Sequence, residues 1–117
     1  MTQLFADNAA STLASSITNV ATSLTLATGE GAKFPSPTGG DHFIATLVGL
    51  TSGVETSWEK VKVTARSGDT LTIVRAQEGS TAAAWASGTK VELRVTAEYL
   101  RAMTSAITHA QYLSGAI

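Results

Sequence analysis

Most of the chain alternates between apolar and polar residues with a period of two, which predicts β-strands. The clearest case is a hairpin whose expected core-facing residues are Val61, Val63, Ala65, Leu71 and Ile73. Its two strands are separated by Ser67-Gly68-Asp69, a combination typical of a tight turn. Because β-branched residues are frequent in both strands, this hairpin is the clearest structural prediction from the sequence.

Similar patterns predict further strands on either side of the hairpin. They cover residues 12–17, 23–27, 42–50 and 90–95. In the last of these, Val91, Leu93 and Val95 alternate with charged residues, which indicates one core face and one solvated face. Residues 28–41 hold so many glycines and prolines that we expect a loop without regular structure there.

The pattern changes at Thr96, a residue type that favours the N-cap of a helix. Glu98 then lies in the first turn, where the helix dipole favours an anion. The apolar seam of the expected helix consists of Leu100, Met103, Ile107 and Ala110, with Gly115 as a plausible stop. A helix with so short a seam is marginal in water, so the seam must pack against another surface.

These patterns together predict an all-β fold with one C-terminal α-helix. We expect mainly antiparallel strands, arranged as a β-sandwich or in a barrel-like sheet. The chain of 117 residues fits a single domain. Residues 1–95 would form a β-rich module, and residues 96–117 a helix for oligomerisation or docking.

The composition favours packing against other subunits. Charged residues make up only 15% of the chain, against roughly 25% in an average soluble domain. Such a surface carries little charge repulsion against association and few long side chains to immobilise. A small independent domain with a Thr/Ser-rich surface is the alternative interpretation.

Charge and hydropathy exclude several classes of partner. The net charge is −1, and the two signs are interleaved along the chain, so no basic face for nucleic acid is expected. No apolar stretch approaches the roughly 20 residues that span a bilayer, and the N-terminus does not resemble a signal peptide, so we expect no membrane partner. The absence of cysteine rules out disulfides and cysteine-ligated metal.

No pattern indicates catalysis, a cofactor or a metal. The two histidines, His42 and His109, belong to different expected elements and have no ligand-spaced partner. No serine stands in a nucleophile elbow. The carboxylates that could in principle form an acid/base pair are Glu55, Glu59, Glu78 and Glu92. Two of them alternate with basic residues on strand faces, which favours solvated cross-strand ion pairs, and we predict that the chain is not an enzyme.

The two tryptophans lead to different expectations. Trp85 is surrounded by alanines, which suggests a plug over the core or into a partner. Trp58 precedes a predicted strand, between Ser57 and Glu59, and is the better candidate for an exposed interface anchor.

One long stretch resembles a segment of tail-fibre and related virion proteins of tailed phages. In that family a Val-x-Val-Thr-x-Arg-x-Gly-Asp-x-Leu hairpin leads to an Arg-x-Gln-Glu-Gly-Thr loop and then to a Trp-x-x-Gly-x-x-Val-Glu-Leu-Arg-x-Thr strand. The corresponding stretches here are residues 61–71, 75–80 and 85–96. Similar residues in the first half are Phe5, Asn8, Ala9, Ser11, Thr12, Leu13, Ile17, Phe34, Pro35, Ser36, Pro37, Gly39, Gly40, Asp41 and Phe43.

The resemblance implies an attachment or assembly role at the virion-proximal end of a fibre, often in trimers, and it brings no catalytic residues. The family's long shaft and receptor-binding tip have no counterpart after the helix, which favours an adaptor, collar, baseplate or short-fibre component.

We therefore predict a non-enzymatic structural protein located in the virion of a tailed phage. It would dock onto other tail subunits and form a homo-oligomer, with a trimer favoured. The expected interface residues are Trp58, Leu100, Met103, Ile107 and Tyr112, and the loop 29–40 would be a second surface. The alternatives are a capsid decoration protein and a receptor- or carbohydrate-binding tail module, and the helix seam has the alternative of packing on the chain's own sheet.

The intersubunit seam leads to a first prediction. Ile107→Asp places a charge at the centre of the apolar stripe, where a buried and unpaired carboxylate is costly. We expect the variant to lose its oligomers in light scattering. An unchanged oligomer would reject the seam as an interface.

Overall fold

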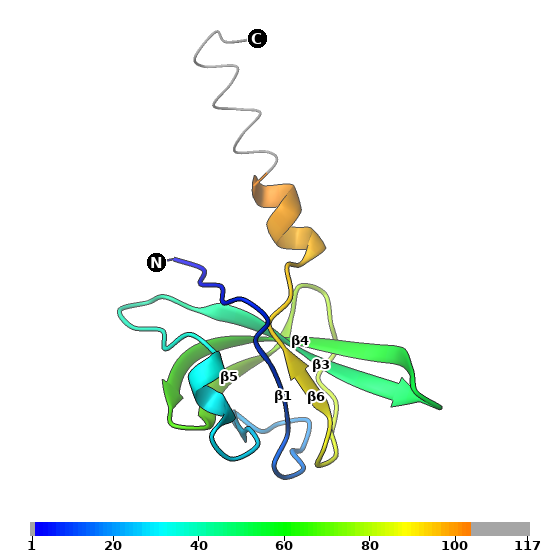
Figure 1. Ribbon diagram of the computed structural model, residues 1–117. Helices are drawn as coiled ribbons and strands as arrows, with labels where there is room; N and C mark the ends of the chain where they lie inside the picture. The colour runs from blue at the N-terminus through cyan, green and yellow to red at the C-terminus, as the bar shows by residue number, and fades with distance from the viewer. Residues whose placement is uncertain (1, 104–117) are drawn as a thin grey trace, which may run out of the picture.

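The computed structural model describes residues 2–103, and these form one curled antiparallel sheet followed by the start of a helix (Figure 1). The strands are β1 (Ala10–Thr12), β2 (Ser23–Thr25), β3 (Phe43–Thr51), β4 (Val54–Ser67), β5 (Thr70–Gln77) and β6 (Lys90–Glu92). Their order in the sheet is β1-β6-β3-β4-β5-β2. The helical residues of the described part are 97–103, and they project away from the sheet (Figure 1).

The two outermost strands meet at one end of the sheet. Leu13 and Leu26, which directly follow β1 and β2, form an antiparallel bridge. The N–H of Ala14 donates to the carbonyl of Thr25, and the N–H of Ala27 to that of Thr12, each at 2.9 Å. The sheet is therefore a half-closed barrel, and the predicted all-β fold with a C-terminal helix is confirmed in its barrel-like form.

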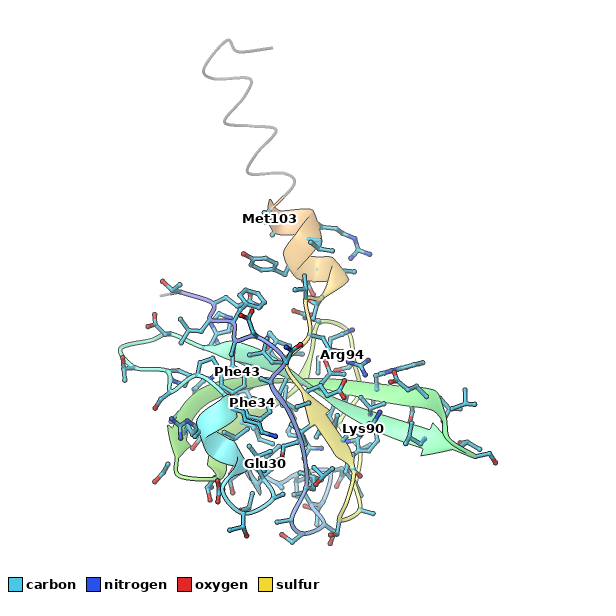
Figure 2. The ribbon with its side chains drawn as sticks, in the orientation of Figure 1. Glu30, Phe34, Phe43, Lys90, Arg94 and Met103 are labelled. Carbon is cyan, nitrogen blue, oxygen red and sulfur yellow. The ribbon has the colours of Figure 1, made fainter. Side chains whose placement is uncertain are left out.

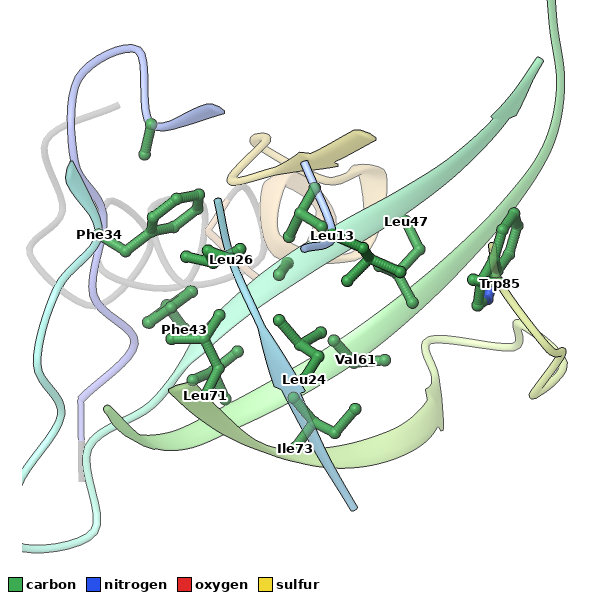
Figure 3. Packing of buried hydrophobic residues seen from close by; sticks show 14 residues of the cluster. Leu13, Leu24, Leu26, Phe34, Phe43, Leu47, Val61, Leu71, Ile73 and Trp85 are labelled. Atoms are coloured by element: carbon green, nitrogen blue, oxygen red, sulfur yellow. The ribbon is translucent and has the colours of Figure 1, made fainter. Parts of the chain in front are cut away.

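The core fills the concave side of the sheet. Its buried members are Ala9, Leu13, Leu24, Leu26, Phe34, Phe43, Ala45, Leu47, Val61, Val63, Leu71, Ile73, Trp85 and Val91 (Figure 3). Phe34 stacks on Phe43 with ring centroids 5.8 Å apart, and Trp85 lies at the other end of the cluster. Burying each large apolar side chain stabilises the fold by roughly 1.5–3 kcal/mol.

Two expected core residues are exposed instead. The register of β4 against β5 shifts between Val63 and Ala65, so Ala65 turns to solvent. Such a bulge interrupts the alternation on which the prediction rests. Val95 is exposed because β6 ends at Glu92 and the chain then leaves the sheet towards the helix.

The first predicted strand is also shifted along the chain. The sequence predicts it over residues 12–17, whereas β1 is Ala10–Thr12 and is followed by single bridges at Leu13 and Ile17. The small residues between these bridges supply little apolar surface to hold a continuous ladder.

The loop 28–41 contains one regular turn, so the prediction of no regular structure is wrong there. Residues Glu30–Lys33 form a 3-10 helix, η1. The carboxylate of Asp69, in the β4–β5 turn, accepts hydrogen bonds from the N–H groups of Gly29 at 3.0 Å and Gly31 at 2.8 Å. A carboxylate from a distant turn thus satisfies N–H groups that a short helix leaves open.

Gly31 is required by this contact. A Cβ atom at this position would meet the carbonyl oxygen of Gly68 and lie 2.9 Å from the Cα of Asp69. Gly31→Ala should lower the free energy of unfolding by about 1–3 kcal/mol, as overpacking does elsewhere. Denaturant unfolding would measure the loss, with the exposed neighbour Ala32→Ser as the control. Equal stability of the two variants would contradict the contact.

Candidate functional site

The β3–β4 hairpin extends beyond its neighbours and forms a projecting ribbon, here called the hairpin tip (residues 49–58). β6 pairs with β3 only at Thr46–Val48, and β5 pairs with β4 only from Lys60 onward. The turn is Ser52-Gly53, with φ of 52° and 79°, a two-residue turn whose left-handed backbone matches the strand twist. The tip therefore stands clear of the barrel (Figure 1).

The hairpin tip exposes apolar side chains. Leu50, Val54 and Trp58 are all exposed, and Trp58 retains 47% of its surface. The sequence predicts this exposure correctly but places Trp58 before the strand. It lies inside β4, opposite Val48 of β3, because pairing between the two strands continues to the turn.

Trp58 is held in place by a chain of side-chain contacts. Its Nε1 donates a hydrogen bond of 2.9 Å to Oε1 of Glu55. Arg94, just beyond β6, binds both oxygens of Glu55 at 3.0 and 2.9 Å, and its Nε also donates to Glu92 at 2.8 Å. Figure 2 shows Arg94 and Lys90 beside the base of the hairpin. A bidentate guanidinium fixes the carboxylate in both position and orientation.

These contacts also change the titration of both charged partners. Hydrogen bonds from Arg94 and then from Trp58 lower the pKa of Glu55 to about 2. The hydrogen bond to Glu55 raises the pKa of Arg94. The pair stays ionised at neutral pH, so the Trp58 ring is presented on a fixed support.

The helix starts as predicted, but the described part of its apolar seam does not pack on the sheet. The Oγ1 of Thr96 accepts a hydrogen bond of 3.2 Å from the N–H of Tyr99, which confirms Thr96 as the N-cap. Leu100 and Met103 remain 44% and 39% exposed. For these two residues, packing on the chain's own sheet is therefore not observed. The other two predicted interface residues of this segment, Ile107 and Tyr112, lie outside the described residues.

The predicted second surface, loop 29–40, is partly turned inward. Phe34 is buried in the core cluster, and Pro37 is also buried. The exposed residues of the loop include Ala32, Lys33 and Ser36. The loop is therefore tied to the barrel and offers only its outer side chains for contact.

Glu59 is the clearest correction to the sequence-based interpretation. The sequence predicts solvated ion pairs for the strand carboxylates, but the side chain of Glu59 is 0% exposed. It accepts hydrogen bonds from Nε and an Nη atom of Arg75, both at 2.8 Å, and from Nε1 of Trp85 at 2.9 Å. The N–H groups of Ala83 and Ala76 also donate to it, at 3.0 and 3.2 Å.

Arg75 extends this buried cluster to two loops. Besides binding Glu59, its guanidinium donates to the carbonyl oxygens of Thr18 and Ala21 in one loop and of Ala83 in another. A guanidinium has five N–H donors, and each has an acceptor here. The ion pair therefore fastens the segments 18–21 and 83–85 to strands β4 and β5.

The electrostatics of Glu59 identify it as a structural anion. Burial raises its pKa, but hydrogen bonds from Arg75, Trp85 and the two backbone N–H groups outweigh burial and lower the pKa of Glu59 to about 2. A carboxylate held ionised in this way is a poor proton donor or acceptor near neutral pH. The sequence did indicate that Glu59 is buried, because residues two apart in a strand share a face and Glu59 precedes Val61 and Val63 in β4 at this spacing.

The remaining candidates from the sequence form no metal-binding group in the described part of the chain. Burial and then Lys62 lower the pKa of His42, and residues 2–103 contain no group of three or more His, Cys, Asp or Glu side chains placed to hold a metal ion. His109 is outside this range. Among the described helical residues, none form a helix long and apolar enough to cross a membrane.

In comparisons with known proteins, no family model matches this chain and no curated protein matches it.

Acid should destabilise the fold through Glu59. Its pKa in the folded chain, about 2, lies below the ordinary value of 4.5. The ion pair therefore contributes fully above pH 4.5 and is lost as the pH falls towards 2. At pH 7, Glu59→Gln should lower the free energy of unfolding by about 3–5 kcal/mol, since Arg75 is left buried and unpaired. Urea unfolding at several pH values should show this difference from the parent shrink in acid.

The exposed pair between Glu30 and Lys33 provides the control. Glu30→Gln should leave the free energy of unfolding at pH 7 nearly unchanged, as for other surface ion pairs. If Glu59→Gln were no more costly than Glu30→Gln, the buried ion pair would not be the support described here.

Proposed function

We propose that this chain is a non-enzymatic structural protein of a tailed-phage virion, of the tail-fibre type, which docks onto other tail subunits as a trimer. The observation that carries the proposal is the exposure of apolar side chains on two separate projections of a firmly built barrel. One is the hairpin tip, with Leu50, Val54 and Trp58, and the other is the helix, with Leu100 and Met103.

The hairpin tip has the properties of a docking element. Tryptophan is enriched among the residues that carry most of the binding energy in protein interfaces. Because Glu55 and Arg94 already hold the ring, docking costs little additional side-chain entropy. An exposed ribbon of two strands cannot bury its apolar side chains within itself, so a partner subunit would supply the surface that covers them.

The helix supports self-association. Leu100 and Met103 open the seam that the sequence continues with Ile107 and Ala110, and both are exposed where the structure describes them. Three helices packed along this seam would bury it, which is the arrangement that the resemblance implies.

The charged groups support a structural role. Within residues 2–103, Glu55 and Glu59 are bound by arginines, and Asp69 caps η1. Several positions of the resemblance make these same contacts. Asp69 belongs to the hairpin motif, Arg75 to the loop motif, and Trp85 and Arg94 to the final strand motif. The shared residues are thus ones that build the barrel and support the hairpin tip.

The proposal can be tested on particles of the phage that carries the gene. An antibody raised against the chain, with immunogold labelling, should mark the tail. Gold on the head would support the alternative of a capsid decoration protein, and particles without label would refute the proposal.

Docking through the hairpin tip can be tested with one substitution. Trp58→Ala should reduce incorporation of the chain into particles at least tenfold, measured by quantitative immunoblotting, because it removes the central anchor. The matched control is Val20→Ala, which truncates a more exposed apolar residue away from the hairpin tip. Both variants should keep the melting temperature of the parent within a few degrees. Equal incorporation of the two would exclude Trp58 as the anchor.

A further inference from the structure

A groove of about 520 Å³ lies beside the part of β4 that β5 does not cover. One wall is the base of the hairpin tip, and the other is the loop 79–85. A tryptophan lines each wall, Trp58 on the first and Trp85 on the second. The complete lining consists of Ser57, Trp58, Gly79, Ser80, Thr81, Ala83, Ala84 and Trp85. The groove therefore lies where a further strand would run if the ladder between β4 and β5 continued.

The main chain of Trp58 is directed towards this groove. The N–H of Lys60 donates a hydrogen bond of 2.9 Å to Oγ of Ser80, which follows β5, so the main chain of Lys60 is directed away from β3. Residues two apart in an antiparallel strand direct their N–H and C=O groups to the same side, so those of Trp58 also face away from β3. β5 pairs with β4 only from Lys60 onward, and in the described part of the chain no strand takes up the two groups of Trp58.

Strained residues turn the chain away from β4 at this point. Ala76 and Glu78 have φ of 54° and 52°, a left-handed backbone that is costly for residues other than glycine. Such strain persists only where surrounding contacts hold it, and it is frequent at functional sites. Oγ of Ser80 provides one such contact by donating to the carbonyl of Gln77 at 2.7 Å. The ladder of β5 thus stops one pairing position short of Trp58.

Both walls of the groove are fixed before anything binds. Nε1 of Trp58 donates to Glu55, and Nε1 of Trp85 donates to Glu59, each at 2.9 Å. Each of these carboxylates is in turn bound by an arginine. The N–H of Ala83 also donates to Glu59 at 3.0 Å, which holds the loop wall. A ligand therefore meets a preorganised groove, and little side-chain entropy is lost when it binds.

The lining indicates the chemistry of the occupant. Apart from the two tryptophans, it consists of Gly, Ser, Thr and Ala, and none of its residues is charged. A charged side chain would therefore lose hydration there without gaining a counter-charge. The N–H and C=O of Trp58 call for a main chain that offers both an acceptor and a donor. Grooves lined by aromatic residues also bind proline-rich segments, but a proline has no N–H for the C=O of Trp58.

The open edge is short. The register of β3 against β4 shifts between Gly49 and Leu50, and Thr56 lies opposite no residue of β3. A bulge of this kind bends the strand, so regular pairing on the outer edge is confined to the stretch around Trp58. Bulges on exposed edges also prevent open-ended pairing between sheets. The edge therefore suits a single short segment.

We infer that this groove receives an extended, uncharged segment of a docking subunit, which pairs with β4 at Trp58. The segment adds a strand in the place that β5 leaves, a recurring mode of peptide recognition. Its side chains pack between Trp58 and the loop 79–85. The inference rests on the proposed function, since another subunit supplies the segment. It adds a main-chain contact to the side-chain anchor of the hairpin tip.

Strand addition can be tested without the partner. The probe is the uncharged peptide acetyl-Ser-Val-Thr-Val-Ser-amide, titrated into the ¹⁵N-labelled full chain and followed by NMR. The backbone amide of Trp58 should shift and saturate with a Kd in the millimolar range. Its hydrogen exchange should slow about sixfold when the free probe is at five times its Kd, because the bound form is protected. The amide of Val61, which faces β3, should keep its exchange rate.

Two further probes separate strand addition from other modes of binding. The same peptide with every amide N-methylated cannot donate to Trp58 and should bind at least tenfold more weakly. The proline-rich peptide acetyl-Pro-Pro-Thr-Pro-Pro-amide should be weaker for the same reason. Equal or tighter binding of either peptide would overturn strand addition, and so would the absence of a saturable shift with the first probe.

Substitutions in the loop wall locate the binding in the groove. Thr81→Arg places a long side chain in the groove from an exposed position and should weaken the first probe at least tenfold. Ala84→Arg, on the same wall, is a second variant and should act in the same way. The matched control is Thr72→Arg, at an exposed threonine outside the groove, which should leave binding unchanged. If Thr81→Arg and Ala84→Arg bind the probe as Thr72→Arg does, the groove is not the site.

The two proposals fail separately. A chain that binds the first probe at Trp58 but is missing from particles retains strand addition and refutes the virion role. A chain found in particle tails whose Trp58 amide is unaffected by the probe retains the virion role and refutes strand addition.

Discussion

The buried ion pair between Glu59 and Arg75 is the contact on which the rest of the structure depends. It joins β4 to β5, and its remaining hydrogen bonds fix the loops that hold Thr18, Ala21 and Ala83. It also orients Trp85, which covers one end of the core. A buried charge pair is stable only when nearly all of its hydrogen-bonding capacity is used, and here each donor of the guanidinium has an acceptor. Short strands and long loops can therefore form a defined barrel around a modest core.

A second arginine has a related role on the outer face. Arg94 spans Glu92 and Glu55, and Glu55 in turn holds the indole of Trp58. This network is partly exposed, so its contribution to stability is small. Its effect is on orientation: it fixes an apolar side chain that the fold leaves outside the core. The network of Glu59 and Arg75 thus stabilises the barrel, whereas the network of Arg94 orients the surface that is proposed to dock.

The alternation of apolar and polar residues was sufficient to predict which side chains are buried where the strands pair regularly. Val61, Val63, Leu71 and Ile73 are buried as expected, and the turn at Gly68-Asp69 is where the sequence placed it. The errors arise where contacts between residues far apart in the sequence determine the local structure. The bulge that exposes Ala65 depends on the register with β5, and the helical turn at Glu30–Lys33 depends on Asp69, some forty residues away. Glu59 had the parity of a core residue, but its partner Arg75 could be assigned only once β4 and β5 were aligned. The exposure of Trp58 was predictable, whereas its support by Glu55 and Arg94 was not.

The pairing of β1 with β6 determines how this barrel would carry mechanical load. Ala10 lies opposite Glu92 and Thr12 opposite Lys90, so the chain enters β1 and leaves β6 at the same end of the ladder. Tension applied between the N-terminal segment and the helix would then break the hydrogen bonds between β1 and β6 one after another. Tension entering at the hairpin tip would instead pull β3 and β4 together and load in shear the ladders that join them to their neighbours, β3 to β6 and β4 to β5. Force along the hairpin is thus shared by several hydrogen bonds at once, whereas force between the two chain ends meets those of β1 and β6 one at a time.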